Sequence, residues 1–160
     1  MSEHTARIVW ARGAAERFVD SRYSRVHTWE FDGGVRVAAS SAVTSVPLPY
    51  SNADNVDPEE AFVAAIASCH MLTFLFLAAR RGLVVDSYDD LARGTMSQDA
   101  RGRFWLSAVR LAPQIAFSGS TPPGDALVDG LHHEAHEECY IANSVRTKIT
   151  VVCAWTHRGG

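Results

Sequence analysis

An apolar run from Ala61 to Ala79 contains no acidic or basic residue, and polar residues that suit helix ends stand on both sides of it. Asp57 is a good N-cap, Pro58 suits the first helical position, and Glu60 can complete a capping box. Gly82 can end the helix. The pattern therefore predicts one long helix that starts at Asp57 and stops before Gly82.

The same run is long enough to cross a membrane. It is nevertheless rich in alanine, it is the only such segment, and polar side chains stand near its centre, at Ser68, Cys69, His70 and Thr73. These features favour a helix in the core of a globular protein, and we expect no membrane partner.

Alternating and β-branched positions in the first 56 residues predict a β-hairpin. Thr5–Trp10 is typical of a short strand, and Ser21–Phe31 is rich in aromatic and β-branched residues. Asp32–Gly34 suits a hairpin turn and Val35–Ser40 the returning strand. Residues 46–55 hold two prolines and predict a loop.

The second half of the chain predicts strands around a second helix. Leu83–Met96 is expected to form one strand broken near Asp89 and Asp90, and Arg103–Phe117 a long strand that Pro113 places at an edge or bulges. Asp125–Cys139 predicts the second helix, and Val145–Trp155 a final strand. The class is therefore α+β with mainly antiparallel pairing, in a single domain over residues 1–160.

Composition excludes several functional classes. The formal net charge is -3, so no basic field for nucleic acid exists. Three cysteines are too few for a disulfide scaffold. The first residues lack a secretory signal pattern, so a cytoplasmic location is expected.

Two cysteines lie where a redox reaction could use them. Cys69 lies within the long apolar helix, and Cys139 ends the apolar stripe of the second helix, so Cys139 should face the core. A lone cysteine in an apolar helix is usually packing, but a second one on another helix makes a disulfide pair worth considering. Cys153, on the apolar face of the last strand, is interpreted as packing.

A reactive Cys69 needs a cation beside it, because a guanidinium lowers a thiol pKa that burial would raise. Alternation in the second strand places Arg25 on the face of Tyr23, His27, Trp29 and Phe31. A buried guanidinium needs an anionic partner. A structural ion pair or a snorkelling arginine is the alternative, and Arg22 and Arg36 fall on more polar faces.

Glu59 is the candidate carboxylate for Arg25. Ten helical residues separate Glu59 from Cys69 by roughly 15 Å along the axis. Either the arginine reaches across, or a second chain completes the site. Alternatively, Glu59 only stabilises the helix N-terminus.

Histidines suggest a different kind of site. The i, i+4, i+7 spacing of His132, His136 and Cys139 could supply three metal ligands, although a partly exposed helix surface explains such histidines more simply. His70 points about 100° away from Cys69 around the helix, so it is a poor base for that thiol. Motifs for a cofactor are lacking, so we expect neither a cofactor nor a metal.

Two stretches carry a resemblance to a known family. They are Asp57-Pro58-Glu59-Glu60-Ala61-Phe62 through Ser68-Cys69-His70, and Ala135-His136-Glu137-Glu138-Cys139 through Asn143-Ser144. In these stretches, and over most of its length, the chain resembles the OsmC/Ohr family of thiol peroxidases. The residue after the first cysteine, and the missing proline after the second, make it look more like an OsmC-like branch than like Ohr itself.

The resemblance implies a fold, an assembly and residue roles. Two central helices would pack against curved antiparallel β-sheets in an intertwined homodimer. Cys69 would be the peroxidatic cysteine and Cys139 the resolving one, and Glu59 matches the acid that tunes the first with an arginine, for which we choose Arg25. A dithiol reductant of the lipoyl type is also implied.

The main hypothesis is a cysteine peroxidase that reduces organic hydroperoxides, and hydrogen peroxide less well, through a Cys69 sulfenate and a Cys69–Cys139 disulfide. An apolar setting favours an oily substrate. The alternative is a non-enzymatic module that binds a hydrophobic small molecule, or a metal through His132, His136 and Cys139.

Overall fold

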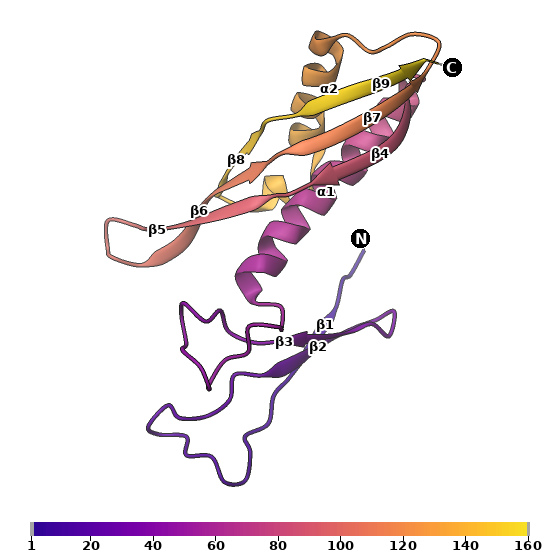
Figure 1. The fold of residues 1–160 in the computed structure, drawn as a ribbon. Helices are drawn as coiled ribbons and strands as arrows, with labels where there is room; N and C mark the ends of the chain where they lie inside the picture. The colour runs from indigo at the N-terminus through magenta and orange to yellow at the C-terminus, as the bar shows by residue number, and fades with distance from the viewer. Residues whose placement is uncertain (1, 160) are drawn as a thin grey trace. The chain divides into compact units, whose positions relative to one another are not determined.

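The computed structural model describes residues 2–159, which divide into two compact units, Met1–Ala61 and Phe62–Gly160. Figure 1 follows the chain through nine strands, two α-helices and one short 3₁₀ helix in these residues. The fold is α+β, as predicted. The prediction of a single domain stays a prediction.

The first unit is built on a three-stranded antiparallel sheet in the order β1-β2-β3. Its strands are β1 (Ala6–Val9), β2 (His27–Phe31) and β3 (Arg36–Ala39). The predicted hairpin turn is confirmed, since Gly34 has a φ of 81° and its N–H donates to the carbonyl of Phe31 at 2.9 Å.

The strand predicted over Ser21–Phe31 is half as long as expected, because residues 21–26 form a loop. The N–H of Arg25 donates to the carbonyl of Tyr50 at 2.8 Å, and the N–H of Val26 donates to the hydroxyl of Ser24 at 3.2 Å. These loop bonds satisfy the backbone in place of a β-ladder. Strict alternation was therefore the wrong basis for orienting Arg25.

Helix α1 (Pro58–Arg80) begins and ends as predicted. The N–H of Glu60 donates to the Asp57 carboxylate at 2.8 Å, and the Glu60 carboxylate accepts the N–H of Asp57 at 3.2 Å, which is a capping box. Gly82 closes the other end with a φ of 71°, and the N–H of Leu83 reaches back to the carbonyl of Ala78 at 3.1 Å.

The second unit contains two mixed three-stranded sheets, ordered β4-β7-β9 and β5-β6-β8. Its strands are β4 (Val84–Asp90), β5 (Arg93–Gln98), β6 (Phe104–Leu111), β7 (Pro113–Gly119), β8 (Lys148–Val151) and β9 (Ala154–Gly159). The predicted break near Asp89 and Asp90 is confirmed, since it separates β4 from β5. The other two predicted strands are also each two strands with a short break. Pairing is antiparallel except for the parallel pairs β6–β8 and β7–β9.

The prediction gave two options for Pro113, an edge strand or a bulge, and the edge strand is wrong. Pro113 is the first residue of the central strand β7, where a missing N–H costs no ladder bond. The preceding N–H, from Ala112, donates to the Asp90 carboxylate at 2.7 Å. At the break in the long strand, the backbone N–H of Ala112 is therefore satisfied by the Asp90 side chain.

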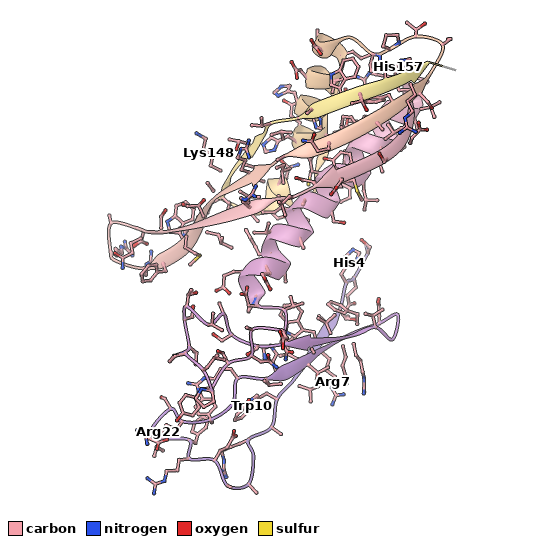
Figure 2. All side chains as sticks on the ribbon, in the orientation of Figure 1. His4, Arg7, Trp10, Arg22, Lys148 and His157 are labelled. Atoms are coloured by element: carbon pink, nitrogen blue, oxygen red, sulfur yellow. The ribbon has the colours of Figure 1, made fainter. Side chains whose placement is uncertain are left out.

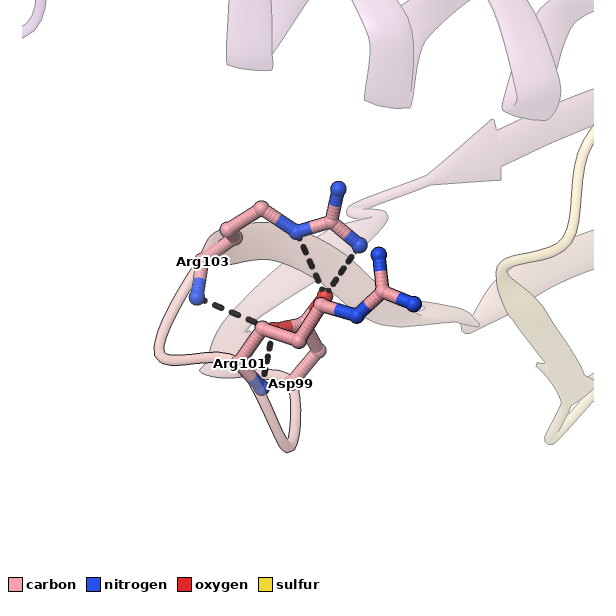
Figure 3. Close-up of polar contacts among 3 residues, drawn as sticks. All are labelled: Asp99, Arg101 and Arg103. Atoms are coloured by element: carbon pink, nitrogen blue, oxygen red, sulfur yellow. Dashed lines mark hydrogen bonds and ion pairs between the residues drawn. The ribbon is translucent and has the colours of Figure 1, made fainter.

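Asp99 shapes the turn between β5 and β6 (Figure 3). Its carboxylate accepts the N–H groups of Arg101 and Arg103 at 2.8 and 3.0 Å, and both Nε and Nη2 of Arg103 at 2.9 and 2.7 Å. The Arg103 backbone bond, followed by its side chain, lowers the pKa of Asp99. One carboxylate thus organises the whole turn.

Two hydrophobic clusters lie under the two sheets. Helix α2 (Asp125–Glu138) and the later half of α1 pack on β7 in the first cluster. Its buried members are Phe74, Leu77, Ala78, Ile115, Phe117, Val128, Leu131 and Ala135. The second cluster centres on Ile66, Val109 and Leu111. Val109, Leu111, Ile115 and Phe117, which alternate along the predicted long strand, are all buried.

Helix α1 keeps an uncovered apolar face. Leu72 is 61% exposed and Phe76 56% exposed, although Ile66, Phe74 and Leu77 on the same helix are buried. Among the described residues 2–159, α1 is also the one helix whose length and composition would allow a membrane span. A single such helix is weak evidence for a membrane, because the core helix of a globular protein meets the same criteria.

Candidate active site

The cysteine pair lies within the second unit. Cys69 is half-buried on α1, and Cys139, the residue that ends α2, is fully buried as expected. Both are free thiols. Burial, and then the neighbouring Cys69 thiol, raise the pKa of Cys139. Cys139 is therefore a thiol at neutral pH and is unsuited to be the first nucleophile.

The chain turns sharply after α2 and fixes Cys139 in place. The 3₁₀ helix η1 (Ala142–Ser144) follows at once, and the N–H of Asn143 donates to the carbonyl of Cys139 at 3.0 Å. The N–H of Ala142 approaches the Cys139 sulfur at 3.4 Å. The side chain of Asn143 also donates to the carbonyl of Glu137 at 2.7 Å. This turn fixes the backbone around Cys139.

A largely apolar cavity of about 490 Å³ lies within the first unit, and both Arg25 and Glu59 line it. Its other lining residues are Ile8, Trp10, Phe18, Tyr23, His27, Ser40, Ser41, Ser45 and Pro58. The sequence pattern predicts that Tyr23, Arg25 and His27 share one surface, and all three do line this cavity. Trp10 and Phe18, which complete its aromatic wall, were not predicted.

Arg25 is half-buried, and its partners differ from those expected. Its Nη1 donates to the carbonyl of Ser21 at 2.8 Å and also to the carbonyl of Tyr23. The guanidinium carbon lies 3.7 Å from the centre of the Tyr23 ring. Within residues 2–159 no ion pair joins Arg25 to Glu59. Two carbonyls and an aromatic face therefore replace the expected carboxylate.

The aromatic wall is held by polar contacts in the loop before β2. The rings of Trp10, Phe18 and Tyr23 contact one another at centre distances of 4.7 to 6.1 Å. The Glu16 carboxylate accepts the N–H groups of Gly13 and Ser24 at 2.8 and 2.9 Å. These two bonds lower the pKa of Glu16. Trp10 and Arg22, which lie in the segment between β1 and β2, are labelled in Figure 2.

The other two arginines considered for this role lie outside the cavity. Arg22 is exposed, and its label in Figure 2 marks the loop before β2. Arg36 is exposed and pairs with Glu30 at 2.7 Å across the sheet. Glu30 binds Arg7 as well, at 2.9 Å. Of the three candidates, Arg25 alone lines the 490 Å³ cavity with Glu59.

The histidines do not form the metal site that their spacing allowed. Within residues 2–159 no group of three or more ligand side chains is arranged to hold a metal. His132 is buried and stacks on His70, whose Nε2 lies 3.0 Å from the Nδ1 of His132. Burial lowers the pKa of both to about 4. His132 thus belongs to the core and not to a partly exposed surface.

Comparison with known proteins places the chain in a family. A family model for OsmC-like proteins matches residues 51–154, which include Glu59, Cys69 and Cys139. The chain belongs to the OsmC-like family. No curated protein matches the chain.

Solved structures agree with this assignment. An OsmC-like protein of unknown function from Vibrio cholerae is 48% identical, and the match covers 96% of this chain and 100% of that one, with a TM-score of 0.93. An organic hydroperoxide resistance protein from Elizabethkingia anophelis is 18% identical over 99% and 98% of the chains, with a TM-score of 0.68. One from Bacillus subtilis is 16% identical over 95% and 98%, with a TM-score of 0.57. The Elizabethkingia anophelis and Bacillus subtilis proteins share the fold of this chain.

Proposed function

We propose that this protein is a cysteine peroxidase that reduces organic hydroperoxides, and hydrogen peroxide less well. The observation that carries the proposal is the location of the Cys69 thiol beside the buried Cys139, whose pKa it helps to raise. Neighbouring thiols on two different helices are the arrangement that a disulfide between them requires. The names of the Elizabethkingia anophelis and Bacillus subtilis relatives, organic hydroperoxide resistance proteins, add support.

The proposed cycle has three steps. The Cys69 thiolate attacks the outer oxygen of the hydroperoxide, the O–O bond breaks, and the alkoxide leaves and takes up a proton as an alcohol. Cys69 is then a sulfenic acid, and the Cys139 sulfur displaces its hydroxyl as water while the Cys139 proton is released with it. An external dithiol, of the lipoyl type, reduces the disulfide and is itself oxidised. A reducing cytoplasm would suit this cycle.

Arg25 and Glu59 are proposed to tune the first step. A guanidinium favours the thiolate form of Cys69 and the charge that develops on the departing oxygen. The cavity that Arg25 and Glu59 share has an aromatic wall, which would favour an oily substrate over a small polar one. Bringing this cavity to Cys69 in the active protein is part of the proposal.

A homodimer is part of the proposal too. The exposed apolar face of α1, with Leu72 and Phe76, needs cover in water, and a second copy of the helix would supply it. Two antiparallel copies of α1 would also bring Glu59 of one chain towards Cys69 of the other. A monomer in solution would refute this part.

The test is hydroperoxide consumption with cumene hydroperoxide and hydrogen peroxide in parallel, with a dithiol as reductant. Cys69→Ser should abolish turnover, and Cys139→Ser should oxidise once and then stall as a sulfenic acid. Cys153→Ser, which removes the third cysteine, should match the wild type. Full turnover by Cys69→Ser would show that the proposal is wrong.

The second candidate is a non-enzymatic module that binds a hydrophobic small molecule. The aromatic wall and size of the 490 Å³ cavity favour it, since small-molecule sites are commonly apolar clefts of this volume. Saturable binding of an apolar fluorescent probe to a protein that consumes no peroxide would favour this function. Metal analysis of the same sample tests the metal variant of this alternative.

A further inference from the structure

His27 joins Trp29 to the backbone of Arg25. The indole Nε1 of Trp29 lies 2.8 Å from the Nε2 of His27, and the Nδ1 of His27 lies 2.7 Å from the carbonyl oxygen of Arg25. All three side chains belong to the first unit, and His27 and Arg25 line the same cavity. The imidazole is half-buried and both of its nitrogens are engaged.

These two partners determine the tautomer of His27. An indole N–H can only donate, so the Nε2 of His27 must be the acceptor and carries no proton. A carbonyl oxygen can only accept, so the Nδ1 of His27 must carry the proton and donate. The neutral Nδ1–H form is the one state that satisfies both bonds, whereas a protonated imidazole would oppose the Trp29 donor with a second donor.

The bond from His27 holds Arg25 from one side while Tyr50 holds it from the other. The N–H of Arg25 donates to the carbonyl of Tyr50 at 2.8 Å, and its carbonyl receives the His27 bond. The guanidinium is then turned back over the Tyr23 ring, with Nη1 bound to the Ser21 and Tyr23 carbonyls. Both the backbone and the side chain of Arg25 are thus fixed although it lies in a loop.

We propose that His27 is a positioning residue for Arg25, held in its neutral Nδ1–H form by Trp29. His27 acts through Arg25 and does not exchange protons with substrate, because both of its nitrogens are already bonded. The inference rests on the proposed function to the extent that Arg25 accelerates oxidation of Cys69. The tautomer and the placement of Arg25 can be tested without that function.

The kinetic test separates the two chemical steps in the full-length protein by rapid mixing with cumene hydroperoxide. His27→Ala should slow Cys69 oxidation about tenfold, the scale of one lost hydrogen bond to a positioned group. It should leave the rate of Cys69–Cys139 disulfide closure unchanged, because Arg25 serves only the first step. General damage to the fold would slow both steps and would refute the positioning role.

Conservative variants identify which nitrogen matters. His27→Asn places an amide N–H near the position of Nδ1 and should recover most of the lost oxidation rate. The longer side chain in His27→Gln places its amide near the position of Nε2, so this variant should not recover the oxidation rate. Thr28→Val, a neighbour outside the cavity lining, is the matched control and should behave as wild type. Equal rates in the Asn, Gln and Ala variants would overturn the proposal.

Nitrogen-15 NMR of the imidazole gives the readout that does not depend on activity. The wild-type spectrum should show a protonated Nδ1 and an unprotonated Nε2, and Trp29→Phe should allow a mixture of tautomers. The Arg25 Nε–H signal should move in His27→Ala and return in His27→Asn. A protonated Nε2 in the wild type refutes the proposal. If the wild type consumes no peroxide but these signals behave as stated, the proposed function fails and the positioning of Arg25 stands.

Discussion

Mild acid should destabilise this protein through the buried His70–His132 pair. The two rings stack at a centre distance of 5.3 Å and are only 1% and 5% exposed. Burial lowers the pKa of each from 6.5 to about 4, and for His70 the charge of His132 adds to the effect. Within residues 2–159 no carboxylate is hydrogen-bonded to either ring, and the nearby Asp129 carboxylate offsets only part of the burial effect on His132.

The sign follows from which state binds more protons. Between pH 6.5 and 4 the unfolded chain protonates these histidines while the folded protein keeps them neutral. The free energy of unfolding is therefore unaffected by the pair at neutral pH and falls as the pH drops through this window. At pH 5 the loss is roughly 2 kcal/mol for each histidine, or about 4 kcal/mol for the pair. That is a large part of the 5–15 kcal/mol typical of a domain.

The assay is urea unfolding at a series of pH values from 7.5 to 4.5, followed by circular dichroism. The His70→Leu/His132→Leu double variant removes both polar groups together, so it should fold and lose most of this pH dependence. His133→Gln is the matched control, since His133 lies on the same helix but its side chain is 77% exposed. If the double variant and the wild type lose stability in parallel between pH 6.5 and 5, the reasoning is wrong.

Two further predictions concern packing within the second unit. Gly94→Ala should destabilise the protein by about 1–3 kcal/mol, because a Cβ there would lie 2.6 Å from the Cγ2 of Val63. Gly33→Ala is the control, because a Cβ there would meet nothing within 4 Å. Equal unfolding midpoints for the Gly94→Ala and Gly33→Ala variants would contradict the prediction. Tyr88→Phe should leave stability unchanged or raise it by about 1 kcal/mol, because the buried Tyr88 hydroxyl has no hydrogen-bond partner among residues 2–159. A clear loss of stability in thermal unfolding would show that the hydroxyl is satisfied, for example by a bound water.

Arg25 illustrates how far the candidate site could be predicted. Alternation in a predicted strand marked Tyr23, Arg25 and His27 as one surface, and they do line one cavity although residues 21–26 form a loop. The partners of Arg25 could not be foreseen, because the carbonyls of Ser21 and Tyr23 become acceptors only through the loop conformation. No residue type in the sequence signals a carbonyl that is free to accept.

Helix α1 and its ends were determined by the sequence alone. A capping box at Asp57 and Glu60 and a left-handed glycine at Gly82 act within one turn of the chain, so local physics is sufficient. The core-facing position of Cys139 follows equally from the apolar spacing of α2.

Only the tertiary structure decided which distant polar groups meet, including those at the strand breaks. The break at Ala112 depends on the Asp90 carboxylate, 22 residues earlier in the chain, and the stacking of His70 on His132 joins two helices across 62 residues. The neighbouring thiols of Cys69 and Cys139 also belong to these two helices. Such contacts form between distant segments, and a local pattern of polar and apolar positions records that a residue is buried but not what it is buried against.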